Sequence, residues 1–267
     1  MNNGFLKAKN NDKMQFYVMW ANHDVPRNYW NCHKYSDDQT LLWNGAVDLE
    51  NFKAIVARVI QQYFKRPNYY KIDGQPVFSL FNIEKFVQGL GGLEQAAQAM
   101  AYFRSETRKA GFPGLHLQQI VFGRPNQKVL GQIKALGADS VTTYNWNSPH
   151  PQDYLQWGVE GMGRGKEWDQ ALSIPFFPNV SIGWDDSPRF PRKTKEQIVH
   201  LNQSPEAFGA FLRQAMDYCD QQPDQPRLIT LYAWNEWVED AYLLPDLKYG
   251  FAYLEAVQKV MRPGRRW

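Results

Sequence analysis

The sequence of 267 residues contains little cysteine and no long apolar segment. Its two cysteines, Cys32 and Cys219, form no CxxC pair, so neither a disulfide framework nor a zinc knuckle is expected, and both thiols should be buried. No segment approaches the ~20 uninterrupted apolar residues of a membrane span, and the polar start MNNGFLKAKNNDK differs from the apolar region of a signal peptide. We therefore expect a soluble protein without a membrane span, whereas its compartment stays open.

Signatures of several other chemistries are also missing. The glycine-rich segment 161–167 ends in Glu167 where a phosphate-binding loop has Ser or Thr, and segment 179–183 lacks the first glycine of a nucleophile elbow. The five histidines form no HxH or HExxH pair. The 30 Lys and Arg residues nearly balance the 27 Asp and Glu residues and are spread along the chain, unlike a nucleic-acid-binding surface. We therefore expect no metal, no cofactor and no nucleic-acid partner.

Aromatic residues, in contrast, are abundant. The 10 Trp, 14 Tyr and 16 Phe residues make up 15% of the chain, and 43% of all residues are hydrophobic, which indicates a sizeable core. No internal repeat, low-complexity segment or linker interrupts the sequence. We therefore expect a single domain over residues 1–267.

Short apolar, β-branched or aromatic runs alternate with segments of helical period, and six βα units result. This alternation predicts an α/β fold with a parallel sheet and right-handed crossovers. The clearest helix starts with Ser204 as N-cap and Pro205 at its first position. The expected strands are 15–20, 76–81, 117–122, 140–144, 178–184 and 228–234, and the expected helices are 51–65, 93–110, 126–136, 152–172, 204–221 and 247–261.

Parallel sheets place ligands at the carboxyl ends of their strands. A single Trp there usually packs in the core, but four of the six expected ends carry a Trp with carboxylate, amide or imidazole neighbours. Aromatic faces beside such groups suit the apolar C–H faces and hydroxyl rim of a sugar. The expected substrate-binding residues are Trp20, Asn22, His23, Tyr144, Trp146, Trp184, Asp185, Arg189, Trp234 and Asn235.

Two glutamates, Glu236 and Glu239, follow the last expected strand. If the chain turns helically after Trp234, positions i and i+3 bring their Cβ atoms to about 5–6 Å. Carboxyl groups roughly 5 Å apart support retaining glycoside hydrolysis, and a wider gap leaves room for the water of an inverting mechanism. Like charges this close oppose each other's ionisation, which supplies a protonated acid beside an ionised base. The alternative is a solvated acidic loop that caps the next helix.

The segment Ala233–Glu239, with the sequence AWNEWVE, resembles the Asn-Glu-Trp-x-Glu signature of glycoside hydrolase family 99 and of the WbsX-like proteins of bacterial polysaccharide loci. Two positions depart from the family pattern: Asp240 stands where Gly is usual, and Leu244 where Glu is common. Further segments of the resemblance, in the expected order, are 19–22, 69–77, 183–189, 243–246 and 249–250.

The resemblance implies a TIM-type (β/α)8 barrel and, in its endo-α-mannosidase branch, a retaining enzyme that works through a 1,2-anhydro sugar. Glu236 matches the base that takes the 2-hydroxyl proton, and Glu239 matches the acid that protonates the leaving oxygen and then activates water. Six βα units are two fewer than a closed barrel, and residues 2–10 read like the tail of a helix before the first strand. We therefore expect an incomplete barrel that lacks the first two units, with an open six-stranded sheet as the alternative.

These observations predict a retaining glycoside hydrolase whose partner is an oligosaccharide or polysaccharide, with Glu236 and Glu239 as catalytic residues. Two alternatives stay open. A WbsX-like glycosyltransferase of polysaccharide biosynthesis would place the same carboxylates near a sugar donor, and a non-catalytic barrel would only bind glycans.

Overall fold

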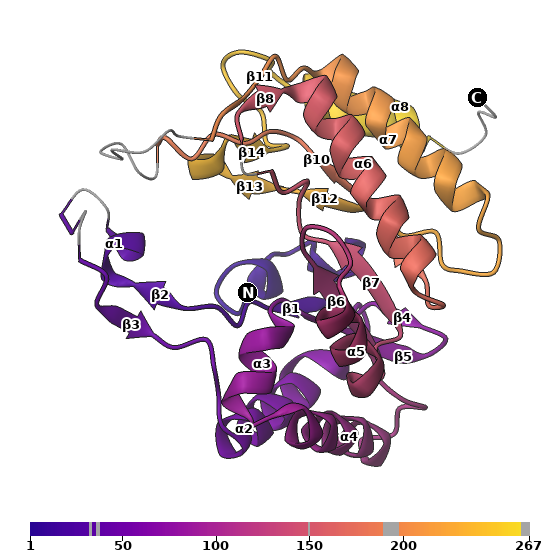
Figure 1. The fold of residues 1–267 in the computed structure, drawn as a ribbon. Helices are drawn as coiled ribbons and strands as arrows, with labels where there is room; N and C mark the ends of the chain where they lie inside the picture. The colour runs from indigo at the N-terminus through magenta and orange to yellow at the C-terminus, as the bar shows by residue number, and fades with distance from the viewer. Residues whose placement is uncertain (32–33, 36–37, 149, 189–197, 263–267) are drawn as a thin grey trace. The chain divides into compact units, whose positions relative to one another are not determined.

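The computed structural model describes residues 1–31, 34–35, 38–148, 150–188 and 198–262. Their contacts divide the chain into two compact units (Figure 1). Unit 1 comprises Met1–Asp24, Trp43–Ile120 and Asn126–Val141, and unit 2 comprises Val25–Leu42, Val121–Pro125 and Thr142–Trp267. A single domain over the whole chain stays a prediction.

Unit 1 is built on a parallel sheet in which the strand order is β1, β5, β6, β7. Every residue of β6 is buried, as expected of a parallel strand covered on both faces. The pairing of β1 with β5 places Val18 opposite Phe78. The strands are β1 (Val18–Trp20), β4 (Lys71–Ile72, antiparallel to β5), β5 (Gln75–Leu80), β6 (His116–Val121) and β7 (Ser140–Thr143), which runs on into unit 2.

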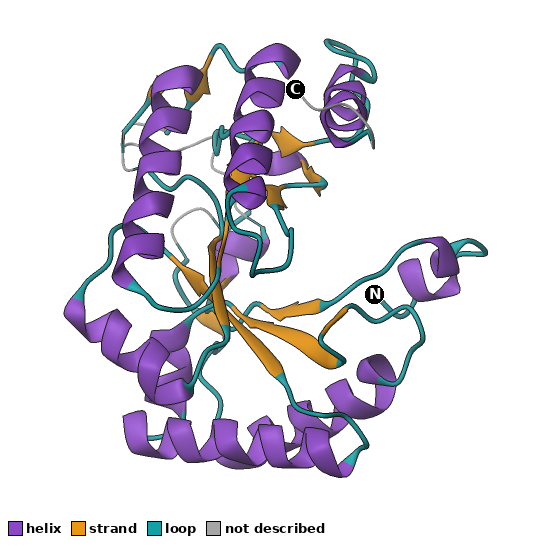
Figure 2. Ribbon diagram, turned by 90° about the vertical axis from the view of Figure 1, so that its right-hand side faces the viewer, coloured by secondary structure: helices purple, strands orange, loops and turns teal. Residues whose placement is uncertain are grey.

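Four α-helices of unit 1 accompany this sheet (Figure 2). Three of them start at an N-cap whose side chain accepts a hydrogen bond from a first-turn amide: Asp48, Asn82 and Asn126. Phenylalanine rings fill the core, and Phe64 stacks on Phe103 with centroids 5.9 Å apart. The helices are α2 (Leu49–Val59, extended by a π-helical turn at Ile60–Phe64), α3 (Ile83–Gly89), α4 (Leu93–Lys109) and α5 (Gln127–Leu136).

Unit 2 contains a second parallel pair, in which Ser181 of β10 lies opposite Tyr232 of β12. Helices α6 and α7 pack on β10, and α8 packs on α7 (Figure 1). The helices in its segment Thr142–Trp267 are α6 (Tyr154–Ala171), α7 (Pro205–Asp220) and α8 (Ala252–Met261). The strands in the same segment are β8 (Gln152–Asp153), β9 (Phe176–Phe177), β10 (Asn179–Ser181), β11 (His200–Leu201), β12 (Thr230–Tyr232), β13 (Asn235–Glu236) and β14 (Ala241–Tyr242).

Two glycines of α6 let large rings approach this helix. A Cβ atom on Gly158 would overlap the ring of Phe211, and one on Gly161 would overlap Trp146. Both aromatic rings belong to one buried cluster between the helices and β10. Close approach of a backbone to a ring therefore requires glycine at these two helical positions.

The predicted α/β class and the parallel pairing of strands are confirmed. The six predicted strand segments and six predicted helices are present, and most of their ends lie within four residues of the predicted ones. Ser204 caps α7 by accepting a hydrogen bond from the amide of Ala207, and Cys219 on the same helix is buried, which raises the pKa of its thiol to about 11. Cys32 lies outside the described residues. Closure of a barrel and the number of its units stay predictions.

Several elements differ from expectation. The sequence did not predict α3, nor the segment made of β2 (Val25–Pro26), α1 (Arg27–Trp30) and β3 (Leu41–Trp43). The predicted helix tail at residues 2–10 is wrong in type, because Phe5–Lys7 and Asn11–Lys13 form short 3-10 turns. No helix in the described part of the chain has the length and apolar character needed to cross a membrane.

Candidate active site

A β-hairpin that directly follows β12 carries both glutamates. Its strands β13 and β14 pair antiparallel, with Glu236 opposite Ala241, and a 3-10 turn at Trp237–Glu239 joins them. The Leu243 amide closes the hairpin by donating to the Trp234 carbonyl at 3.1 Å. The helical turn expected directly after Trp234 is therefore wrong in its start: Asn235 and Glu236 form a strand, and a 3-10 turn begins only at Trp237.

Asp240 ends this turn in the left-handed conformation, with φ 50° and ψ 33°. Aspartate tolerates that region better than most residues, and glycine occupies it freely, which is consistent with the glycine that the family resemblance implies at this position. The Gln203 side chain donates to Oδ2 of Asp240, and the Tyr249 hydroxyl donates to the Gln203 carbonyl at 2.8 Å. The end of the turn is therefore tied to the segments before α7 and before α8.

Glu239 is buried, with 6% of its surface exposed, although Trp237 in the same turn is 47% exposed. The Tyr232 hydroxyl at the end of β12 donates to Oε2 of Glu239. The Asp185 amide, beyond β10, donates to the Glu239 carbonyl at 2.9 Å. Segments that follow both strands of the parallel pair therefore hold Glu239, while Glu236 lies half-buried on the same hairpin.

Tyr232, which binds this carboxyl group, packs against two further aromatic rings. The Tyr232 ring lies 4.8 Å from the Tyr144 ring and 6.1 Å from the stacked Trp184 ring, measured between centroids. The Asn179 side-chain amide donates to the Tyr144 carbonyl at 3.1 Å and to Oγ1 of Thr230 at 3.0 Å. A buried side chain at the start of β10 thus fixes the chain that carries Tyr144.

The surroundings of the hairpin are acidic. Burial raises the pKa of Asp240, and the negative charge of Asp185 adds to the rise. Lys248 and the hydrogen bond from Gln203 oppose it. The alternative left open by the sequence was a solvated acidic loop that caps the next helix. The hairpin is not such a loop, because Glu239 is buried and the next helix, α8, starts only at Ala252.

The other predicted binding residues of unit 2 differ in exposure. Trp234 is 54% exposed and Asn235 is exposed, while Trp184 and Asp185 are half-buried. Trp146 is only 1% exposed and donates its indole N–H to the Asn179 carbonyl at 2.9 Å. The prediction that Trp146 binds substrate is therefore corrected: its ring fills the core because Gly161 makes room for it. Arg189 lies outside the described residues.

The three predicted binding residues of unit 1 are Trp20, the last residue of β1, and Asn22 and His23, which follow it. The Trp20 ring stacks on Phe52 with centroids 6.1 Å apart, and Nδ1 of His23 lies 2.9 Å from the Asp24 carbonyl oxygen. Asn22 is buried; its side chain donates to the Asn82 carbonyl at 2.7 Å and accepts from the Asn82 amide at 2.8 Å. These two bonds give Asn22 a structural role, whereas a ligand contact by Trp20 or His23 stays a prediction.

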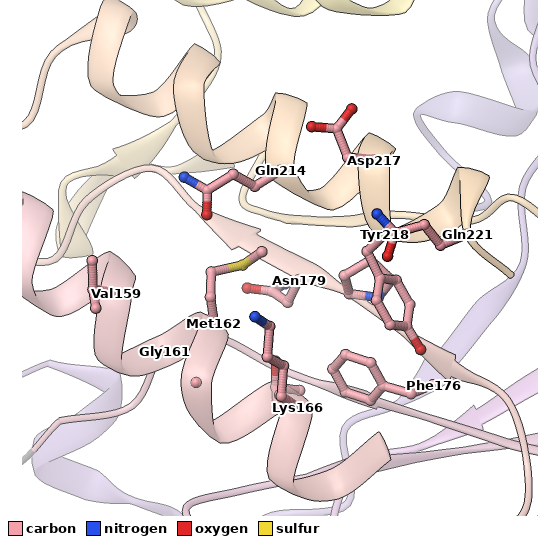
Figure 3. Close-up of a pocket in the computed structure, with 14 residues that line it drawn as sticks. Val159, Gly161, Met162, Lys166, Phe176, Asn179, Gln214, Asp217, Tyr218 and Gln221 are labelled. Atoms are coloured by element: carbon pink, nitrogen blue, oxygen red, sulfur yellow. The ribbon is translucent and has the colours of Figure 1, made fainter. Parts of the chain in front are cut away.

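A pocket of about 490 Å³ lies between α6 and α7, and none of the predicted binding residues is among the residues that line it. Figure 3 shows Met162 and Lys166 of α6 on one side and Gln214 and Asp217 of α7 on the other. Gly163 lines it, and a Cβ atom there would meet nothing within 4 Å. Among the described residues, no group of three or more His, Cys, Asp or Glu side chains could hold a metal ion.

Sequence reasoning missed Tyr232. It lies inside a predicted strand, so its side chain was counted with the sheet rather than with the strand-end residues. The available signal was its position, four residues before Glu236 in the same segment as the carboxylates.

Residues 2–257 match the family described as Glycosyltransferase WbsX. The chain belongs to this family. Two curated relatives, each described as "Uncharacterized protein WxcX" and each from a strain of Xanthomonas campestris pv. campestris, are 25% identical to it over 259 residues. The match covers 93% of this chain and 35% of each relative, so the WbsX-family chain spans about a third of their length.

Solved structures resemble this WbsX-family chain in fold. A "Glycoside hydrolase-like protein" aligns with a TM-score of 0.57 at 15% identity over 81% of this chain and 61% of its own. The GH99 endo-alpha-mannosidase from Bacteroides thetaiotaomicron aligns with a TM-score of 0.52 at 14% identity over 82% and 62%, respectively. The resemblance to glycoside hydrolase family 99 and to WbsX-like proteins is confirmed, and at these identities the structural likeness concerns the fold alone.

Proposed function

We propose that this WbsX-family chain is a retaining glycoside hydrolase that acts on a glycan through Glu236 and Glu239. The observation that carries the proposal is the hairpin after β12, which holds a buried glutamate and a half-buried glutamate at the two ends of one 3-10 turn. Two carboxyl groups in different environments can divide the roles of acid and base.

Each carboxyl group has one role in the proposed first step. Glu239 gives its proton to the glycosidic oxygen, whose bond to C1 breaks with the electron pair leaving on that oxygen. Glu236 takes the proton of the sugar 2-hydroxyl, and the 2-oxygen forms the new bond to C1 of a 1,2-anhydro sugar. Water then opens this ring at C1, giving its proton to Glu239, while Glu236 returns its proton to the 2-oxygen. Both groups end as they began.

A sugar as substrate is supported by the aromatic side chains around the hairpin. Trp234 is more than half exposed, and Trp237 stacks on Tyr242 with centroids 4.0 Å apart, so its ring is backed by a second ring. Amphipathic rings of this kind match the alternating C–H faces and hydroxyl groups of a pyranose.

A glycosyltransferase is the second candidate, and the description of the matching family favours it. The same two carboxyl groups would serve, with an acceptor hydroxyl in place of water in the second step. The two candidates therefore differ in what attacks C1, not in which residues lie beside it.

Digestion in H₂¹⁸O separates these candidates. The chain is incubated with a panel of bacterial polysaccharides and oligosaccharides, with and without sugar acceptors, and the products are analysed by mass spectrometry. Hydrolysis places ¹⁸O at the new reducing end, whereas transfer lengthens the acceptor without the label. Cleavage should disappear in Glu236→Gln and persist in Glu255→Gln, because Glu255 is exposed on α8. Glycan binding by the folded chain without any cleavage or transfer would contradict the proposal.

A further inference from the structure

Tyr232 has a contact that the steps above do not use. Only 4% of its surface is exposed, and its hydroxyl donates to Oε2 of Glu239. Its ring contacts two others, the Tyr144 ring at 4.8 Å and the stacked Trp184 ring at 6.1 Å between centroids. Its carbonyl accepts from the Ile182 amide at 2.9 Å, which fixes its backbone to the strand beside it.

We propose that Tyr232 is a positioning residue, which orients the Glu239 carboxyl group and stabilises the carboxylate that Glu239 becomes after it has given up its proton. This inference rests on the proposed function, in which Glu239 alternates between acid and base. A buried tyrosine whose ring contacts two other rings and whose backbone lies in a strand has little freedom to move its hydroxyl. The carboxyl group bound to it is restricted in the same way.

The Tyr232 hydroxyl is a neutral hydrogen-bond donor in acidic surroundings. Asp240 is adjacent to Glu239, Glu236 lies on the same turn, and Asp185 lies where the segment after β10 contacts the Glu239 backbone. All of these are acidic, and the charge of Asp185 raises the pKa of Asp240, the residue next to Glu239. Lys248 and Asp246, before α8, act on Asp240 with opposite signs. A neutral donor within hydrogen-bonding distance favours the carboxylate without adding a charge, and bonds to charged groups are stronger than neutral ones.

The variant Tyr232→Phe keeps the ring and removes only the hydroxyl. We expect kcat to fall about 10- to 100-fold with little change in KM, because the acid is less well placed after substrate has bound. The limb of the kcat/KM profile that reports Glu239 should move to higher pH by about one unit, since the ionised form has lost its donor. Tyr154→Phe is the matched control: this buried tyrosine of the same unit donates to the Ser181 carbonyl at 2.7 Å, and its loss should leave the profile in place.

A second measurement needs no substrate. Urea unfolding of the wild type, Tyr232→Phe, Glu239→Gln and the double variant between pH 4 and 8 gives the coupling of the two side chains. The destabilisation by Tyr232→Phe should grow as Glu239 ionises and should lose this pH dependence in the Glu239→Gln background. An active enzyme whose profile does not move in Tyr232→Phe, or a cycle without pH-dependent coupling, would overturn the inference. Coupling in a chain without glycosidic activity would instead overturn the proposed function.

Discussion

The ends of two parallel strands, β1 in unit 1 and β12 in unit 2, carry similar sequences and use them differently. After β1, Asn22 binds the backbone of Asn82 through two hydrogen bonds, so its polar groups complete the fold. After β12, Trp234 and Asn235 are exposed, and the next turn buries Glu239 against Tyr232. A tryptophan followed by polar residues therefore marks the end of a strand, but it does not by itself mark a ligand site.

The difference has a local cause. Asn82 is the N-cap of α3, so the chain after β5 needs partners for backbone groups at a helix start, and Asn22 provides them. The chain after β12 does not enter a helix at once. It folds back as a hairpin, which satisfies its own backbone and leaves its side chains available for other contacts.

The largest change in stability is expected for a variant that tests whether Trp146 belongs to the core of unit 2 rather than to the candidate site. Gly161→Ala forces a methyl group into the Trp146 ring and should lower the free energy of unfolding by about 3 kcal/mol or more. Gly163→Ala, on the same helix, meets open space and should gain up to about 1 kcal/mol from helix propensity. Chemical denaturation measures both, and equal effects would show that Trp146 is not packed against α6.

His200 of unit 2, like Asn22 of unit 1, is a polar residue that is buried in the fold. His200 is buried and stacks on Trp157 with centroids 4.2 Å apart, and burial lowers its pKa from 6.5 to about 4, with Glu160 and Arg164 acting in opposite directions. The unfolded chain therefore takes up a proton below pH 6.5 that the folded chain does not. Stability from this group is complete above pH 6.5 and falls by on the order of 3 kcal/mol as the pH drops to about 4.

Thermal unfolding across that pH range checks the histidine prediction. His200→Phe should flatten the stability profile between pH 6.5 and 4, whereas the exposed His150→Gln should leave its slope unchanged. His116 contributes in the same direction, because burial also lowers its pKa, and this part of the slope should remain. An unchanged slope in His200→Phe would mean that the ring is not buried in solution.

A pair of asparagine variants compares the two strand ends directly. Asn22→Ala removes two hydrogen bonds to the backbone of half-buried Asn82, whose carbonyl keeps the Phe86 amide as a donor, and should cost about 2 kcal/mol of stability. Asn235→Ala, at an exposed position, should change stability by less than about 0.5 kcal/mol and should weaken substrate binding instead. The reverse result, with Asn235 the more destabilising change, would break the comparison.

The smallest expected effect concerns Asp240, the left-handed residue that ends the 3-10 turn of the hairpin. Asp240→Gly should unfold within about 0.5 kcal/mol of the wild type, whereas Asp240→Ala should be less stable than Asp240→Gly by about 1 kcal/mol, because alanine is strained at φ 50°. The raised pKa of Asp240 means that its charge opposes folding, so stability from its protonated form is lost as the pH rises. The free energy of unfolding of Asp240→Gly, relative to that of the wild type, should therefore be higher at pH 7 than at pH 3.

Sequence periodicity was sufficient for the sheet and for the long helices. The α7 helix shows why: Ser204 and Pro205 mark its start, and Phe208, Phe211 and Leu212 lie on its buried face. The short α3 was missed because it has only seven residues and is separated from α4 by Leu90–Gly92. A helix this short offers too few turns for a periodic pattern.

The candidate site was less accessible to sequence reasoning, because burial depends on residues far away in the chain. Trp146 is a core residue only because Gly161 faces it. Glu239 is buried because Tyr232 and the segment at Asp185 surround it. The pair of glutamates, in contrast, was predicted from spacing and from family resemblance, and the structure places both on one hairpin.

The most direct test of the account is the leaving-group dependence of Glu239→Gln. If Glu239 is the general acid, the variant should lose about 10²–10⁴-fold in kcat/KM on a natural oligosaccharide but much less on an aryl glycoside whose good leaving group needs little protonation. Glu236→Gln should be poor on both substrates, because the 2-hydroxyl still lacks its base. Equal and mild losses of both variants on both substrates, in chains shown to be folded, would contradict the assignment of acid and base to this hairpin.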